Sequence, residues 1–241
     1  MKKIKISIVV VTYNAACFVE KTITSIINQV YSDYELLLID GGSMDRTVEI
    51  VREKCVKTTD LIILSEPDNG IYDAMNKGAR LSTGDFIIFL NAGDYFYNDE
   101  VLLNVVGKIL NLNTIYYGDA LGFNESNYTI PYRVGQFTKY RLAHENICHQ
   151  TVFYPRSCFF MNHFDIQYQI LADWEFNIRM FKKYSFCHLE LIIVLYDLAG
   201  ISAITPDFVF ERKQKSMILK YLGLDTVLFL FFRKFVKYIK C

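Results

Sequence analysis

Acidic residues follow apolar runs closely in the sequence at three places in the first half of the chain, at Asp40, Asp68 and Asp94. A carboxylate can hydrogen-bond a base or a ribose, and it can hold a hard cation such as Mg²⁺ or Mn²⁺ that bridges to a pyrophosphate. For Asp94, a surface turn or a cap for the helix expected near residue 99 is an equal alternative. The position of these acids in the fold must therefore decide what they do.

Apolar runs supply the strands that must position these acids. They are rich in Ile, Leu, Val and Phe without polar alternation, which is typical of strands buried on both faces. The strands expected are 4–12, 35–40, 61–65 and 85–90. Segments with helical spacing of apolar residues follow them, at 19–30, 47–55, 71–81 and 99–110. This alternation predicts an α/β fold whose mostly parallel central sheet has helices on both faces.

Polar and glycine-containing segments follow each of the four expected strands. They are TYN (12–14), DGGS (40–43), EPDNG (66–70) and NAGD (91–94). In open parallel sheets, ligands bind outside the carboxyl ends of the strands. The first half of the chain therefore predicts one binding site built from these four segments.

The alternation ends near residue 115, and a helix at 173–184 and a strand at 190–196 are expected further on. Asp173 opens that helix, where an acid is favoured by the helix dipole whatever its chemistry, so both a catalytic and a structural role are open. Glu175 and Arg179, spaced i,i+4, are expected to form a surface pair. Trp174 either stacks on a sugar ring or packs in the core.

Composition excludes several classes of protein. The 241 residues carry 26 Lys and Arg against 26 Asp and Glu, so no basic footprint for nucleic acid is present and no nucleic-acid partner is expected. Six cysteines without a CxxC pair argue against a structural zinc site and favour free thiols in a reducing cytosol. The dinucleotide, P-loop and GxSxG motifs are absent.

The tail from residue 210 to 241 is expected to form a basic amphipathic helix. Its apolar face contains Leu228, Phe232, Phe235 and Ile239, and the remaining positions contain Arg233, Lys234, Lys237 and Lys240. The apolar run 227–232 is far shorter than the roughly 20 residues that span a bilayer, so contact with a membrane interface is favoured. Packing on the main domain or on a homodimer partner is the alternative.

Four segments together carry a family resemblance. SIVVVTYNA, LLLIDGGSMDRT, SEPDNGIYDAMNKGA and STGDFIIFLNAGDYF, in this order, resemble a family 2 glycosyltransferase with the glycosyltransferase A (GT-A) fold. The resemblance is strong over about residues 4 to 100, and HQTVFYPR and ADWEFNIRMF continue it more weakly. It implies transfer of a sugar from a nucleotide-sugar donor to an acceptor hydroxyl, with inversion.

The resemblance also implies roles for matching positions. Asp173 would be the catalytic base, and Asp94 would hold Mg²⁺ or Mn²⁺ near the pyrophosphate. Asp40 would hydrogen-bond the donor base, with Asp68 near the base or ribose. The implied substrate-binding set is Thr12, Tyr13, Asn14, Asp40, Asp68, Gly70, Asn76, Lys77, Asn91, His149 and Gln150.

Two departures from the family pattern bear on phosphate and metal binding. The metal loop, residues 91–94, has one carboxylate where relatives have two or three. This either weakens the metal affinity or shifts part of the coordination to His149, Asn91 or water. Met75 replaces an Arg that many relatives have, which leaves phosphate charge to Lys77 or to another residue.

The expected organisation is a catalytic domain over 1–205, with a nucleotide-binding half (1–113) and an acceptor half (114–205), and a helical extension over 206–241. The tail suggests a lipid-linked glycan acceptor in bacterial surface polysaccharide synthesis. It also suggests a cytoplasmic location, peripheral at the inner face of the plasma membrane. A degenerate nucleotide-sugar binding protein is the alternative. A sugar nucleotidyltransferase is disfavoured because TYNAACF lacks the glycine-rich basic loop that this class needs.

Overall fold

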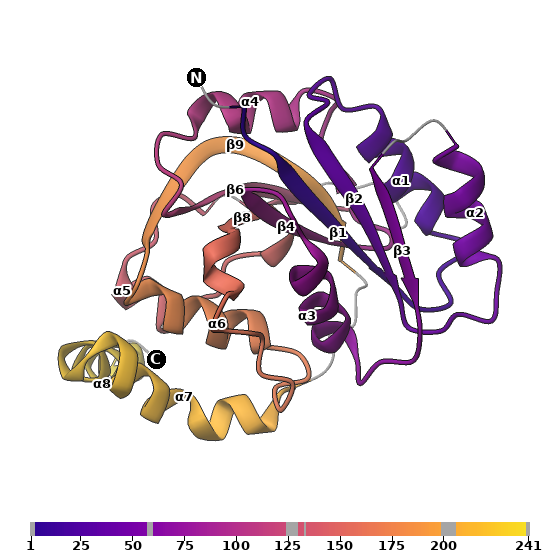
Figure 1. The fold of residues 1–241 in the computed structure, drawn as a ribbon. Helices are drawn as coiled ribbons and strands as arrows, with labels where there is room; N and C mark the ends of the chain where they lie inside the picture. The colour runs from indigo at the N-terminus through magenta and orange to yellow at the C-terminus, as the bar shows by residue number, and fades with distance from the viewer. Residues whose placement is uncertain (1–2, 57–59, 124–129, 133, 199–205, 240–241) are drawn as a thin grey trace.

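The computed structural model describes residues 3–56, 60–123, 130–132, 134–198 and 206–239. Its first half contains four parallel strands, β1 (Ile6–Thr12), β2 (Tyr34–Asp40), β3 (Leu61–Ser65) and β4 (Phe86–Asn91), in the order β3-β2-β1-β4. Every residue of β1 is buried, as its unbroken apolar run predicted. The predicted alternation of strands and helices in this half is confirmed (Figure 1).

Helices cover both faces of this sheet. Helices α1 (Val19–Ile27), α2 (Thr47–Lys54) and α4 (Val101–Lys108) pack against one face, where Ile6, Ile8 and Val10 point. On the other face, α3 (Ile71–Leu81) and α6 (Ala172–Phe181) pack over Val9 and Val11 (Figure 1). At Gly78 of α3, a Cβ would lie 2.3 Å from Val9 Cγ1, so glycine lets this helix lie close to the sheet.

The second half of the chain extends the same sheet. Strand β8 (Val152–Pro155) pairs antiparallel with β4, and β6 (Thr114–Phe123) pairs antiparallel with β8. Strand β9 (Ser185–Asp197) then pairs parallel with β6. The short strands β5 (Tyr95–Phe96) and β7 (Ile130–Tyr132) pair with β9 and β6. The short helices α5 (Lys139–Leu142), η1 (His149–Thr151) and η2 (Arg156–Phe159) join these strands. Strand β9 starts five residues before the predicted strand at 190.

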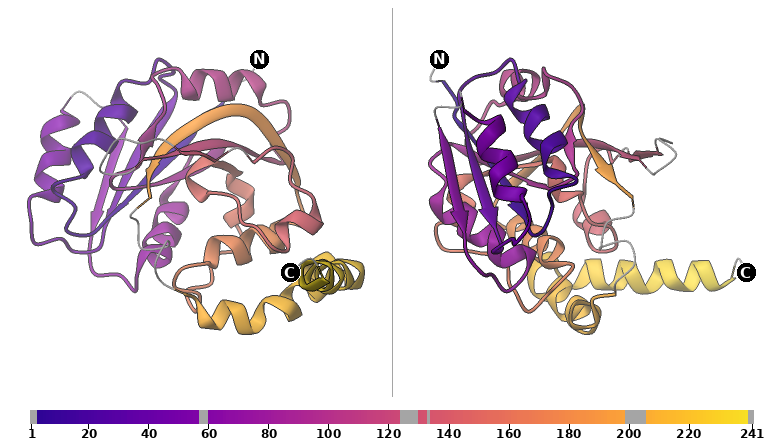
Figure 2. Two further views of the ribbon diagram at one scale, coloured as in Figure 1. Left: turned by 180° about the vertical axis from the view of Figure 1, so that it is seen from behind. Right: turned by 90° about the vertical axis from the view of Figure 1, so that its right-hand side faces the viewer.

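The tail differs from its prediction in one respect. It contains two helices, α7 (Phe208–Leu222) and α8 (Leu224–Ile239), and not a single one. Gly223 separates them with a φ of +98°, a conformation that glycine adopts without strain. Helix α7 lies against α6, and α8 projects from the body of the molecule (Figure 2). None of the helices in the described residues is long and apolar enough to cross a membrane.

Candidate active site

The carboxylate of Asp40 lies at the end of β2 and is surrounded by donors. It accepts hydrogen bonds from Thr12 Oγ1 (2.9 Å), Ser65 Oγ (2.7 Å) and both Oγ and N of Ser43 (2.5 and 2.8 Å). Gly42 N adds a fifth at 3.2 Å. Burial by itself raises the pKa of Asp40, but the bonds from Ser43, Ser65 and Thr12 outweigh it and lower the pKa. Asp40 is therefore an anion that ties the ends of three strands together.

Asn14 forms the turn after β1 with a left-handed φ of +47°, which Asn tolerates better than most residues. Its backbone N–H donates to Ser43 Oγ (2.7 Å), and its side-chain Oδ1 accepts from Met44 N (3.0 Å). These bonds hold the β1 turn against the β2 turn, and they leave the neighbouring Tyr13 outside, with 67% of it exposed.

The side chains of Tyr13 and Asp68 both lie against Gly41, and we call these three residues the cradle. A Cβ at Gly41 would lie 2.7 Å from Asp68 Oδ2 and 3.3 Å from Tyr13 Cδ2, so both side chains rest against the glycine. Asp68 Oδ1 accepts from Gly70 N (2.9 Å), which fixes the loop before α3. An exposed aromatic ring beside a carboxylate suits a base and ribose.

Asp94 is buried after the end of β4 and is contacted from η1. Gln150 Nε2 donates to Asp94 Oδ2 at 2.8 Å, and Cys148 Sγ donates to Gln150 Oε1 at 3.0 Å. Burial raises the pKa of Cys148, and the negative charge of Asp94 raises it further, so the thiol stays protonated and can donate. Asp94 and Gln150, predicted separately as a metal ligand and a substrate-binding residue, are thus in direct contact.

His149 bridges the end of β4 and the start of α6. Asn91 Nδ2 donates to His149 Nε2 at 3.3 Å, so the proton of a neutral imidazole lies on Nδ1. That Nδ1 lies 3.3 Å from Asp173 Oδ2. Three residues predicted separately, from distant parts of the sequence, therefore form one polar chain.

Two residues that hold Asp173 were not predicted. The hydroxyl of Tyr72 lies 3.0 Å from Asp173 Oδ1 and 2.6 Å from Ile170 O, and Asn146 Nδ2 donates to Asp173 Oδ2 at 2.9 Å. Burial raises the pKa of Tyr72 well above its usual value, and the charge of Asp173 adds to this, so Tyr72 remains a donor. Trp174 N donates to Asp173 Oδ1 at 2.8 Å.

The sequence offered a weak signal for one of these two residues. Tyr72 lies inside one of the four family-like segments, four residues before Asn76 on the same helix. Asn146 has no such signal, because only the fold brings it to a carboxylate 27 positions away.

The side chains of two predicted donor-binding residues already make hydrogen bonds within the protein. Asn76 donates to Phe164 O (2.8 Å) and accepts from Phe164 N (2.9 Å). Lys77 Nζ donates to Pro67 O (2.8 Å) and pairs with Glu66 (3.0 Å). Donor contacts by Asn76 and Lys77 stay predictions, and each would require breaking these bonds.

Two expectations for α6 are decided by packing. Glu175 and Arg179 do form an ion pair, at 2.6 Å, but the expectation of a surface pair was wrong because Glu175 is buried. Burial raises the pKa of Glu175, and the bond from Arg179 opposes that shift. Trp174 stacks on Phe210 at 4.9 Å between ring centroids, which places its indole in the core.

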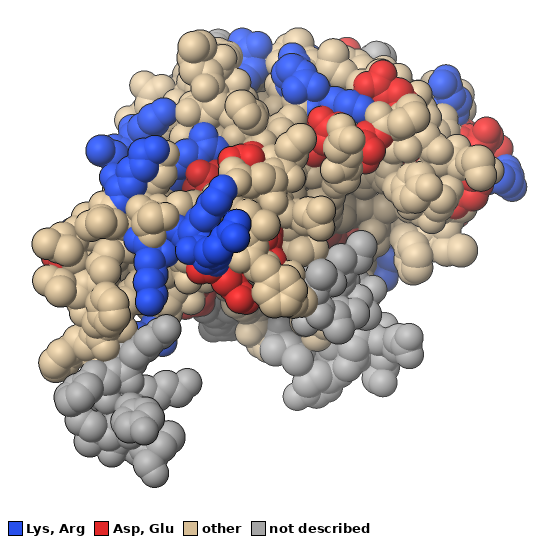
Figure 3. All heavy atoms as spheres, turned by 90° about the horizontal axis from the view of Figure 1, so that it is seen from below, with Lys and Arg blue, Asp and Glu red and all other residues tan. Residues whose placement is uncertain are grey.

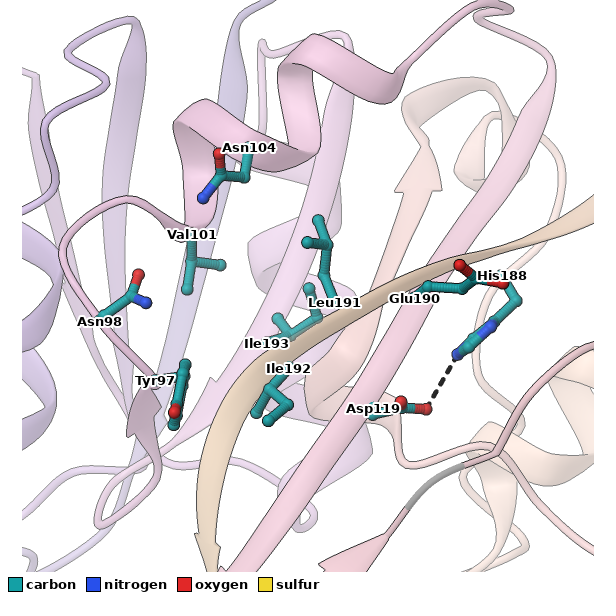
Figure 4. Close-up of a pocket in the computed structure, with 10 residues that line it drawn as sticks. All are labelled: Tyr97, Asn98, Val101, Asn104, Asp119, His188, Glu190, Leu191, Ile192 and Ile193. Atoms are coloured by element: carbon teal, nitrogen blue, oxygen red, sulfur yellow. Dashed lines mark hydrogen bonds and ion pairs between the residues drawn. The ribbon is translucent and has the colours of Figure 1, made fainter.

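A separate cavity of about 500 Å³ lies between α4, β6 and β9 (Figure 4). Beside it, His188 Nε2 lies 2.9 Å from Asp119 Oδ1, which also accepts from Val134 N. The contact between His188 and Asp119 thus links β9 to β6. None of the predicted site residues lines this cavity.

The comparison with known families decides what kind of protein this is. The profile of "Glycosyl transferase family 2" matches residues 7–170. A Mycobacterium tuberculosis protein named "PGL/p-HBAD biosynthesis glycosyltransferase" is 34% identical over 215 residues, which cover 86% of this chain and 82% of that relative. The chain belongs to glycosyl transferase family 2. It is therefore a glycosyltransferase.

Solved structures show the same fold. TarS of S. aureus superposes with a TM-score of 0.70 at 17% identity, covering 90% of this chain and 43% of the TarS chain. The present chain thus spans less than half the length of that chain. The mannosyltransferase PcManGT of Pyrobaculum calidifontis, in complex with GDP-Man and Mn²⁺, gives 0.65 at 15% identity, covering 92% and 62%. The glycosyltransferase described here has the GT-A fold.

The residues around Asp94 fit a hard cation only in part. Asn91 Oδ1 is buried and has no hydrogen-bond partner among the described residues, so it is an oxygen available for a ligand. The described residues contain no cluster of three or more His, Cys, Asp or Glu side chains suited to a metal. Mg²⁺ is commonly held by one or two carboxylates together with substrate phosphates, and Asp94 with Asn91 meets that minimum.

Proposed function

We propose that this glycosyltransferase transfers a sugar from a nucleotide-sugar donor to an acceptor hydroxyl with inversion, with Asp173 as the general base. The observation that best supports this proposal is the chain of polar contacts from Asn91 through His149 to Asp173. It joins the end of β4, where the donor is proposed to bind, to helix α6. Asp173 is 4% exposed and held by four contacts. The contact from His149, at 3.3 Å, is the longest of the four.

The reaction is a single displacement. The acceptor oxygen forms a bond to the anomeric carbon while the bond from that carbon to the pyrophosphate oxygen breaks. The nucleoside diphosphate leaves with the electron pair, and Asp173 takes the proton of the acceptor hydroxyl. A positioned base contributes about 10²- to 10⁴-fold to such a reaction.

The donor nucleotide is proposed to lie in the cradle of Tyr13, Gly41 and Asp68. Neighbours in fold support this class of donor, since TarS is described in complex with UDP-GlcNAc and PcManGT in complex with GDP-Man. Asp40, whose oxygens are occupied by five protein donors, shapes the pocket by holding the β1 and β2 turns. Its predicted bond to the base would replace one of these donors.

Mg²⁺ or Mn²⁺ is proposed as the cofactor, held by Asp94 and Asn91 with the donor phosphates. When bound, it would neutralise charge that develops on the leaving diphosphate. Gln150 keeps Asp94 in place through its bond to Oδ2.

The acceptor is proposed to be a lipid-linked glycan in bacterial surface polysaccharide synthesis, reached at the cytoplasmic face of the plasma membrane. The exposed aromatic side chains of α8 support a lipid-linked acceptor. The mycobacterial relative is named for PGL and p-HBAD biosynthesis, which supports a role in biosynthesis.

The test is a panel of UDP-, GDP- and TDP-sugars with Mn²⁺ and candidate acceptors, scored for release of nucleoside diphosphate. One donor should give acceptor-dependent release that Asp173→Asn abolishes. Donor binding without release for any acceptor would favour the degenerate binding protein, which the single carboxylate of the metal loop also suggests.

A further inference from the structure

One side of helix α8 is apolar and uncovered. Leu224, Leu228, Phe231 and Phe232, spaced i, i+4, i+7 and i+8, are 62%, 58%, 56% and 69% exposed. We call these four side chains the α8 face. The opposite side of the helix is also apolar, and there Val227 and Leu230 pack on the core. Since contiguous exposed apolar side chains mark interaction sites, the α8 face needs an occupant.

The α8 face continues into a groove. Phe229 lies with its ring 5.1 Å from Tyr140 of α5, and the groove between α5 and α8 has a volume of about 760 Å³. Asp225 at its edge bonds Tyr140 (2.8 Å) and Lys139 (2.5 Å). These bonds fix the start of α8 on the body, so the apolar face is held in a defined orientation.

Positive charge is concentrated in the tail that carries this face. Residues 206–233 contain five Lys and Arg against three acids, and residues 234–241 add three lysines and no acid, although the whole chain has a formal net charge of zero. Lys215, Lys220 and Arg233 are exposed, and Lys215 Nζ lies 5.3 Å from the ring of Phe231. In the view from below, Lys and Arg atoms gather on the left half of the molecule, with uncharged atoms and some Asp and Glu atoms beside them (Figure 3).

The apolar side chains and the nearby cations together indicate what binds to the α8 face. A second copy related by a two-fold axis would present the same surface, and it would bring these cations against themselves. An anionic bilayer surface complements both properties, because acyl chains take up the apolar side chains and phosphates take up the cations. We propose that the α8 face docks onto an anionic membrane surface, with Lys215, Lys220 and Arg233 at the headgroup phosphates.

The docking surface is joined directly to the segment that carries Asp173. Asp207 caps α7 by accepting from Phe210 N (3.0 Å), and its other oxygen accepts from Ile170 N and Leu171 N (3.1 and 3.2 Å). Helix α7 is thereby bonded to the two residues before α6. The consequence, which rests on the proposed function, is that docking orients the acceptor half toward a lipid-linked substrate.

Flotation of the full chain with vesicles tests the docking without reference to catalysis. The vesicles are phosphatidylcholine with or without phosphatidylglycerol. We expect binding to the anionic vesicles that high salt weakens. The variants Leu228→Ser/Phe232→Ser and Lys215→Glu/Lys220→Glu should each weaken it about tenfold or more. Leu110→Ser, 93% exposed after α4, is the matched control and should bind like the wild type.

Two results would overturn the proposal. One is equal binding to both vesicle types, or binding that neither variant changes. The other is a dimer in solution that Leu228→Ser/Phe232→Ser abolishes, because the face would then belong to a second copy. Circular dichroism and the Tm of each variant must match the wild type, which is expected because the substituted side chains are exposed.

A kinetic comparison separates this proposal from the proposed function. With a soluble acceptor, Leu228→Ser/Phe232→Ser should keep wild-type turnover, and with a vesicle-borne acceptor its turnover should fall. If the wild type binds anionic vesicles as expected but transfers no sugar, docking stands and the proposed function fails. If turnover on the vesicle-borne acceptor is unchanged in the variant, the orienting role of docking fails.

Discussion

His149 Nδ1 lies 3.3 Å from Asp173 Oδ2, and the same imidazole accepts a hydrogen bond from Asn91 Nδ2 through Nε2. The ring therefore presents its Nδ1–H to the carboxylate and its lone pair to the amide. A single side chain links the end of β4, next to the metal loop, with the proposed base on α6.

Replacing His149 should slow turnover without loss of the fold. We expect His149→Ala to lower kcat about tenfold or more, because Asp173 loses one of the contacts that orient it. The amide of His149→Asn can reach the position of Nδ1, so this variant should keep more activity than the alanine variant. Steady-state kinetics with saturating donor measure the difference. Equal activity of the two variants would contradict the positioning role.

Asp173→Asn should remove proton acceptance and keep donor binding. We expect kcat to fall about 10²- to 10⁴-fold with an unchanged donor Kd, since the amide is nearly isosteric but is not a base. Calorimetry with the donor and turnover assays measure the two quantities. Asp165→Asn is the control. Asp165 accepts a hydrogen bond from Gln167 N in the segment before α6, so this variant should change neither kcat nor the donor Kd. Near-normal turnover of Asp173→Asn would show that another group is the base.

Asp94→Ala should weaken metal-dependent donor binding. The substitution removes the carboxylate of the metal loop, so the donor Kd in Mn²⁺ should rise about tenfold or more. A chelator should weaken the wild type to a similar extent and leave the variant unchanged. Titration calorimetry with and without chelator measures this. A donor Kd that neither the substitution nor the chelator alters would show that Asp94 does not hold a metal needed for donor binding.

Gly41→Ala should damage the donor cradle but not the fold. The new Cβ would lie 2.7 Å from Asp68 Oδ2, and the end of this side chain can shift. We expect a higher donor Kd with a Tm close to that of the wild type. Gly107→Ala is the matched control, since no atom lies within 4 Å of its Cβ and alanine stabilises a helix by about 0.5–1 kcal/mol. An unchanged donor Kd in Gly41→Ala would show that the nucleotide binds elsewhere.

Glu35 should make stability depend on pH in the acid range. Burial raises the pKa of Glu35, but hydrogen bonds from Ser7 and Thr83 and the ion pair with Lys5 outweigh it and lower the pKa to about 2. Because the folded pKa is depressed, this stability is present above the unfolded pKa, near 4.5, and is lost as pH falls toward 2.

Glu35→Gln tests this dependence. At neutral pH it should lose about 3 kcal/mol of unfolding free energy, and the difference from the wild type should vanish as the pH approaches 2. Urea unfolding across this range measures it, with exposed Glu53→Gln as the control. A difference that is constant from neutral to acid pH would show that Glu35 acts through packing and not through its charge.

The sequence alone determined the first half of the fold and the edge of the sheet where the site lies. Unbroken apolar runs such as the one ending at Thr12 are typical of buried strands, and helices between such strands favour parallel pairing. Parallel strands end at one edge, so Asp40 and Asp94 had to lie near it. These conclusions follow from local patterns, which a linear sequence contains in full.

The tertiary structure decided which polar groups are used by the protein itself and which remain for a ligand. Asn76 and Lys77 were expected to contact the donor. Instead Asn76 bonds Phe164, which the sequence does not place beside α3, and Lys77 bonds Pro67 in the loop just before that helix. Asn146 and Tyr72 reach Asp173 for the same reason. Hydrogen bonds between distant segments depend on how elements pack and not on local periodicity. The break at Gly223, which turns one expected helix into two, likewise depends on a backbone angle that only glycine adopts freely.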